Sequence, residues 1–302
     1  MIYDIKLRIT YDYANSAVGG RHVICLRPID LPLVQRVIAS ALDVDPAPEE
    51  WQERQDFFDN HVAEFGFRGA HDHLAVTLTA RIERLVPTLA LPPSLPMRDL
   101  PQMLSKSRQL GAQSPLHFMS PSTRVPLNSK MTGFAKAAVT PGMTVAEAVR
   151  AIGTALHKHM KFDSKATTVD TQAAEAFAQR RGVCQDFSHI MIACLRGIGV
   201  PAGYVSGFLR TKPPPGKPRL EGADAMHAWV RAWAGEDLGW IEYDPTNDMA
   251  AGTDHIVVAY GRDYSDVVPI KGTMRTSGRQ KSHQAVDVIP VLEPALVVPG
   301  AG

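Results

Sequence analysis

Three residues of this chain are of the types that nucleophilic acyl chemistry requires. Cys184 lies in GVCQDF at 182–187, His227 in HAWV at 227–230 and Asp244 in DPTN at 244–247. In such chemistry a thiolate attacks an acyl carbon, an imidazole moves the proton, and a carboxylate orients the imidazole. Each residue alone has a commoner structural explanation, but the three together predict a Cys-His-Asp triad.

Cys184 stands where a strongly periodic apolar pattern begins. Apolar residues follow it at helical spacing, namely Phe187, Ile190, Met191, Cys194, Leu195 and Ile198. The unpaired N-H groups and the positive dipole end of a helix N-terminus favour a thiolate and can hold a developing oxyanion. Because Cys184 shares the apolar face, its sulfur points toward the protein body and needs a cleft to be reached. Cys25 and Cys194 are interpreted as buried core residues.

His227 and Asp244 fall on two consecutive predicted strands. Period two places His227 and Trp229 on one strand face, and we expect Trp229 and Gln185 to border the substrate cleft. The next predicted strand ends at Asp244, after a turn containing glycine. A symmetric hairpin would place Asp244 nearer Val230 than His227, so a bulge or twist has to close that gap.

The elements that position these residues indicate an α+β protein in two parts. Residues 2–86 show mostly period-two patterns, and a proline-rich segment follows. Thr144 and Glu147 form a capping-box pattern before a predicted helix near 145–160, and a short helix near 172–180 is expected after a cap at Thr171 or Asp170. The cysteine helix and a run of antiparallel strands come next.

From this organisation we predict a β-rich N-terminal domain at 1–125, a catalytic core at 126–275 and an irregular tail at 276–302. The fold class is α+β, with the cysteine helix packed on an antiparallel sheet.

Composition excludes several functional classes. The chain has 32 Lys plus Arg against 31 Asp plus Glu in 302 residues, scattered along it, so neither a nucleic-acid partner nor an acidic membrane surface is expected. The opening residues alternate like a strand instead of a signal peptide, and no apolar run approaches the roughly 20 residues of a membrane span. Three widely spaced cysteines favour free thiols and a cytoplasmic location.

No cofactor or metal is predicted. The HDH sequence at 71–73 puts two imidazoles on one strand face, but without a third ligand nearby an exposed pair is the preferred interpretation. The KPPPGKP stretch at 212–218 is interpreted as a stiff surface loop beside the cleft.

The motifs GVCQDF, HAWV and DPTN, in the order Cys, His, Asp, resemble those of the transglutaminase-like superfamily of papain-like cysteine enzymes. The resemblance is to a bacterial branch that carries an extra N-terminal β domain. It implies that Cys184 is the acylated nucleophile, His227 its base and later acid, and Asp244 the residue that orients His227. It further implies a peptide or protein amide substrate and a thioester that water or an amine resolves, and hydrolysis is favoured because water is the default acceptor.

Two alternatives to an enzyme remain open. The first is a catalytically silent relative that binds partners or plays a structural part through its β domain. The second is a redox protein, which is less favoured because the chain has no C-x-x-C motif. The oligomeric state is not predicted.

Overall fold

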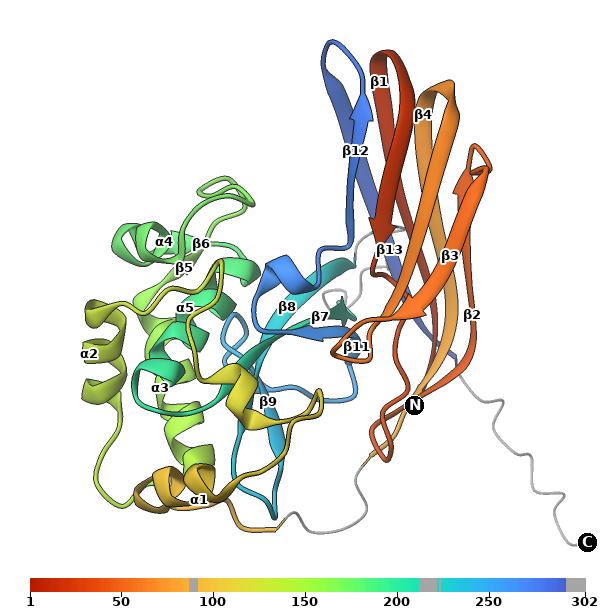
Figure 1. Ribbon diagram of the computed structural model, residues 1–302. Coiled ribbons are helices and arrows are strands. Elements are labelled where there is room, and N and C mark those ends of the chain that lie inside the picture. Colours follow the sequence, from red (N-terminus) through yellow and green to blue (C-terminus); the bar gives the residue numbers. More distant parts are fainter. Residues whose placement is uncertain (87–91, 212–221, 223, 292–302) are drawn as a thin grey trace, which may run out of the picture.

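The computed structural model describes residues 1–86, 92–211, 222 and 224–291 of the chain. Helices gather on one side of the molecule and long strands on the other, with a second sheet between them (Figure 1). The described helices are α1 Leu100–Lys106, α2 Ser129–Ala138, α3 Val145–His159, α4 Ala173–Gln179 and α5 Cys184–Gly197, with 3-10 turns at Met97–Asp99, Pro115–Phe118 and Tyr264–Asp266. The strands are β1 Ile2–Ile24, β2 Gln35–Asp45, β3 Glu50–Gln55, β4 His61–Arg84, β5 Lys161–Phe162, β6 Arg181–Gly182, β7 Ala202–Leu209, β8 Ala225–Trp233, β9 Trp240–Asp244, β10 Met249–Ala250, β11 His255–Gly261, β12 Ile270–Arg275 and β13 Gln280–Val291. The predicted α+β class is confirmed.

The N-terminal sheet is built on two long antiparallel strands, β1 and β4. They pair from Ile2↔Glu83 to Ile24↔Ala63, with register shifts between Asp12 and Gly20. The pairing continues across these shifts, where a β-bulge or other irregularity interrupts the ladder. Side chains at 3, 5, 7 and 9 of β1 are buried as period two predicts. We call this sheet, with β2, β3, β12 and β13, the β domain.

Both ends of the chain contribute to the β domain. β13 pairs with β1 from Ile2↔Val291 to Tyr13↔Gln280, and β12 pairs with the second half of β1. The prediction of an irregular tail from 276 is therefore wrong for 280–291, and residues 292–302 lie outside the described residues. Val286 and Val288 are buried with period-two spacing, and Pro290 is tolerated because β13 is an edge strand.

The central sheet has the strand order β10-β9-β8-β7-β11, and all of its pairings are antiparallel. α5 is almost entirely buried; α2, α3 and α4 pack against it, and so do strands β7 and β8 (Figure 1). This is the predicted arrangement of a cysteine helix on an antiparallel sheet. The capping box of Thr144 and Glu147 is confirmed, whereas α4 starts after Gln172, not after Thr171 or Asp170.

None of the helices in the described ranges is long and apolar enough to cross a membrane. The KPPPGKP loop lies outside the described residues. The domain boundaries at 125 and 275 stay predictions, although β12, inside the expected core range, pairs with β1.

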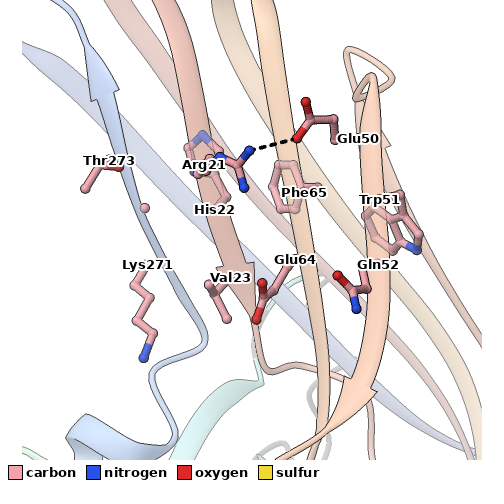
Figure 2. Close-up of a pocket in the computed structure, with 11 residues that line it drawn as sticks. Arg21, His22, Val23, Glu50, Trp51, Gln52, Glu64, Phe65, Lys271 and Thr273 are labelled. Carbon is pink, nitrogen blue, oxygen red and sulfur yellow. Dashed lines mark hydrogen bonds and ion pairs between the residues drawn. The ribbon is translucent and has the colours of Figure 1, made fainter.

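A groove of ≈ 570 Å³ opens on the β domain between β1, β3, β4 and β12 (Figure 2). Arg21 of β1 donates there to Glu50 of β3 at 3.1 Å, and Lys271 and Glu64 add further charges. The residues that line this groove fall within 21–65 and 271–273. None of them belongs to the Cys, His or Asp motif.

The β domain also buries two histidines. The ring of His22 stacks on Phe65 at 4.9 Å, and His71 packs against Phe67 and Tyr13. His71 is 8% exposed, so the expectation of an exposed 71–73 pair is wrong for His71 and holds for His73. Burial, followed by the nearby His71, lowers the pKa of His22.

This lowered pKa predicts acid sensitivity of the β domain. His22 must stay neutral in the folded protein, so stability is fully present above the unfolded histidine pKa of about 6.5 and falls as the pH drops below it. We expect the loss of unfolding free energy between pH 7.5 and 5 to become smaller in His22→Phe, which retains a ring against Phe65. Urea unfolding at both pH values measures this. His283→Gln, at an exposed histidine of β13, is the control, and an equal loss in wild type and His22→Phe would contradict the prediction.

Candidate active site

The sequence around Cys184 builds the start of α5. The carboxylate oxygen Oδ2 of Asp186 accepts the N-H of Val183 at 2.8 Å and the hydroxyl of Thr167 at 2.6 Å, which caps the helix. A Cβ on Gly182 would stand 2.5 Å from Oδ2 of Asp186, so a glycine is required there. These contacts explain the GVCQD sequence and place Cys184 in the first turn, where backbone N-H groups have no partner within the helix.

Cys184 differs from the other two cysteines in exposure. It is half-buried, whereas Cys25 is 5% and Cys194 is 0% exposed. Burial raises the pKa of both Cys25 and Cys194 to about 12. Both are therefore protonated and inaccessible, as predicted, and Cys184 is the thiol that solvent can reach.

His227 and Asp244 are in direct contact. Nε2 of His227 lies 2.7 Å from Oδ2 of Asp244, and both side chains are shielded from solvent. The β8–β9 pairing ends at Val230↔Tyr243, so Asp244 is not held opposite Trp229 and its carboxylate turns toward His227. A symmetric hairpin would keep Asp244 too far from His227. Because the β8–β9 ladder ends at Tyr243, one residue before Asp244, the Asp244 side chain can reach the imidazole.

The carboxylate of Asp244 is completely buried and accepts several hydrogen bonds. Oδ1 accepts the backbone N-H groups of Thr246 and Asn247, and Oδ2 accepts the Asn247 side-chain amide at 2.7 Å. Nε2 of His255 lies 3.2 Å from the same Oδ2. Burial alone would raise the pKa of Asp244, but the bonds from His227, His255 and Asn247 outweigh it and hold the pKa well below its usual range.

Two groups act on the imidazole of His227. Nε2 faces Asp244, so Nδ1 is the nitrogen left for the sulfur of Cys184, the second group that raises the pKa of this ring. Burial lowers the pKa of His227, but Asp244 and Cys184 together raise it to about 10. His227 is therefore a base strong enough to hold a proton at neutral pH.

Two family models match the chain, one over the core that carries Cys184, His227 and Asp244 and one over the β domain. Residues 132–245 match the model described as "Transglutaminase-like superfamily", and residues 3–83 match "Bacterial transglutaminase-like N-terminal region". The chain belongs to the transglutaminase-like superfamily. The first match contains Cys184, His227 and Asp244, and the second covers most of β1 to β4.

Relatives of this transglutaminase-like protein match nearly its whole length. An uncharacterized Mycobacterium tuberculosis (strain H37Rv) protein is 32% identical over 292 residues, covering 95% of this chain and 92% of the relative. A Mycobacterium leprae protein is 31% identical over 256 residues, covering 84% and 86%. A crystal structure from Cytophaga hutchinsonii, named "Putative Cysteine Protease", has a TM-score of 0.72 at 20% identity, covering 97% of this chain and 92% of that one. This likeness shows that the two proteins share the transglutaminase-like, papain-like fold.

The two residues expected to border the cleft are both buried in the transglutaminase-like core. Gln185 is 8% exposed, and its amide donates to the carbonyl of Val169 at 3.1 Å, which ties a preceding loop to α5. Trp229 is 0% exposed, and its indole N-H donates to Glu242 at 2.7 Å. The expectation that Trp229 lines the cleft is wrong, because its ring packs in an internal cluster with Val205 and Tyr260. The ring centroids of Trp229 and His227 lie 6.1 Å apart and the two rings are stacked, so Trp229 packs beside the imidazole.

His255 is the residue at this site that sequence analysis missed. It is the first residue of β11, and its only signal was an imidazole at the start of a predicted strand. His227, Asp244 and His255 each offer a ligand atom, and these atoms lie within 4.8 Å of one another, a spacing that a divalent ion can bridge. In this structure the same atoms are joined by the hydrogen bonds described above, which account for their arrangement without an ion.

Proposed function

We propose that this protein is a cysteine-dependent hydrolase of peptide or amide bonds that works through a thioester. The observation that carries the proposal is the contact between His227 and a completely buried Asp244, together with a half-buried Cys184 that acts on the same imidazole and raises its pKa. This is the arrangement of nucleophile, base and orienting group that acyl transfer uses. The free state of all three described cysteines supports a cytoplasmic location.

The reaction starts with an ion pair between Cys184 and His227. The thiolate attacks the carbonyl carbon of the amide, and N-H groups of the first turn of α5 stabilise the oxyanion. The C-N bond breaks as the His227 imidazolium gives its proton to the leaving amine, and a thioester remains on Cys184. Water then attacks the thioester and gives a proton to His227, and the acid leaves as the C-S bond breaks, which restores the Cys184 thiolate and the His227 imidazolium. An amine in place of water would give transfer, the transglutaminase outcome.

The test of the ion pair is alkylation of the three thiols. With limiting iodoacetamide between pH 5 and 9, we expect Cys184 to react fast below pH 7 and to lose this advantage in His227→Ala, because a lone thiol is protonated there. Peptide mass spectrometry resolves the three sites, and Cys25 and Cys194 serve as internal controls. If Cys184 in the folded protein reacts no faster than those two, the site is silent and the partner-binding alternative takes precedence.

A further inference from the structure

The proposed triad has a fourth member within hydrogen-bond distance, His255. Its Nε2 lies 3.2 Å from Oδ2 of Asp244, and the two side chains are 1% and 0% exposed. Besides Asp244, the titratable group that faces this ring is His227, at 6.2 Å between ring centroids, and Trp229 packs edge-on at 5.1 Å. A buried donor on a buried carboxylate restricts where that carboxylate can point.

The protonation of His255 follows from its other nitrogen. The backbone N-H of Gly252 donates to Nδ1 of His255 at 3.2 Å. An imidazole nitrogen that accepts a hydrogen bond carries no proton, so the proton of the neutral ring is on Nε2 and is directed at Asp244. His255 therefore donates from Nε2 to the carboxylate that orients His227.

The β domain holds the turn that carries His255. Arg84 of β4, which is 5% exposed, donates from Nη2 to the carbonyl of Gly252 at 3.1 Å and from Nη1 to Gln35 at 3.4 Å. The side chain of Gln35 in β2 bonds both the N-H and the carbonyl of Val257, two residues after His255.

The hydroxyl of Tyr3 in β1 donates to Asp254 at 2.9 Å. Three strands of the β domain thus contact residues 252–257 of the core.

We propose that His255 is a positioning residue for Asp244, and that the β domain keeps it in place through Arg84 and Gln35. The inference rests on the proposed function and extends it. A continuous series of hydrogen bonds runs from Arg84 through Gly252, His255 and Asp244 to His227. The β domain is then part of the catalytic apparatus, which gives the second family segment a function in the reaction.

The experiment uses the full chain and two pairs of variants. His255→Phe keeps a ring against Trp229 but removes both hydrogen bonds, and His255→Gln returns a donor. Arg84→Met removes the bond to Gly252, and Arg84→Lys returns a donor. Arg81→Gln is the matched control, since Arg81 lies on the same strand in an exposed pair with Asp4.

We expect His255→Phe to lower the alkylation rate of Cys184 at pH 6 and the kcat for an amide substrate by about ten- to a hundredfold, the range for one hydrogen bond to a charged group, with KM unchanged. The acid limb of the rate profile moves to higher pH, because a less firmly positioned Asp244 stabilises the His227 imidazolium less and the ion pair of the proposed reaction forms at higher pH. Arg84→Met lowers the alkylation rate of Cys184 and the kcat by about three- to tenfold. The Gln and Lys variants recover most of the loss, and Arg81→Gln behaves as wild type.

The readouts separate this inference from the proposed function. Long-range ¹⁵N-¹H spectra of wild type report the tautomer of His255 independently of turnover, and a proton on Nδ1 overturns the inference while the triad stands. If His255→Phe does not fold, Arg84→Met decides. If Arg84→Met keeps the alkylation rate, the kcat and the acid limb of wild type, the inference is overturned. If Cys184 of the wild type shows no enhanced reactivity, the proposed function fails and the inference fails with it.

Discussion

Cys184→Ala is expected to reduce amide turnover by about a thousandfold or more, because no thioester can form without the sulfur and the backbone donors of α5 have no adduct to stabilise. Hydroxylamine trapping and intact-mass spectrometry on a substrate series detect the acyl-enzyme directly. Wild type should gain the mass of the acyl group and Cys184→Ala should not. The half-exposed position of Cys184 at the start of α5 makes this effect specific to one thiol.

Cys194→Ala is the matched control, since Cys194 lies on the same helix, is 0% exposed and has a pKa raised by burial to about 12. Its turnover should equal that of wild type once any loss of stability is allowed for by thermal denaturation. If acylation persists in Cys184→Ala, or disappears in Cys194→Ala, Cys184 is not the nucleophile.

Asp244→Asn should lower kcat by about a thousand- to ten-thousandfold, the range for replacing the orienting carboxylate of a triad. A neutral amide cannot offset the positive charge of an imidazolium. If its NH₂ group takes the place of Oδ2, it is a donor that faces the three donors of wild type. Burial then dominates, and the pKa of His227 falls from about 10. The fast alkylation of Cys184 below pH 7 disappears with it.

The same substitution changes how stability depends on pH. The raised pKa of His227 contributes stability that is fully present below the unfolded value of about 6.5 and is lost as the pH rises toward 10. Wild type should therefore lose unfolding free energy between pH 7 and 10, and Asp244→Asn should lose less. Asp237→Asn, at an exposed aspartate in the turn before β9, is the control. If the unfolding free energy falls as steeply between pH 7 and 10 in Asp244→Asn as in wild type, this would falsify the ion pair between His227 and Asp244.

The local patterns predicted much of the core. The apolar spacing after Cys184 predicted α5, and the alternation around His227 predicted β8, because both periods follow from backbone geometry within one element. Strand β13 was missed because its alternation is short and contains Pro290. Its partner β1 is at the other end of the chain, so local sequence carries no record of the pairing.

Burial of polar side chains was predicted least well. Trp229 was assigned to the cleft from its strand face, but the face is covered by the cluster that includes Tyr260. His71 was assigned to the surface, but Tyr13 and Phe67 enclose it. Period two says which side chains share a face, and it does not say what lies against that face.

The sequence by itself determined the helix that begins at Cys184 and the candidates for nucleophile, base and orienting acid, since each lies in a short motif whose chemistry is local. Only the tertiary structure decided that Asp244 reaches His227, because that depends on where the β8–β9 ladder ends. It also decided that His255 meets Asp244, and that the side chain of Arg84 binds a carbonyl 168 residues away in the chain. A hydrogen bond between distant segments is directional and short-ranged, so its partners are defined only once the two domains have packed.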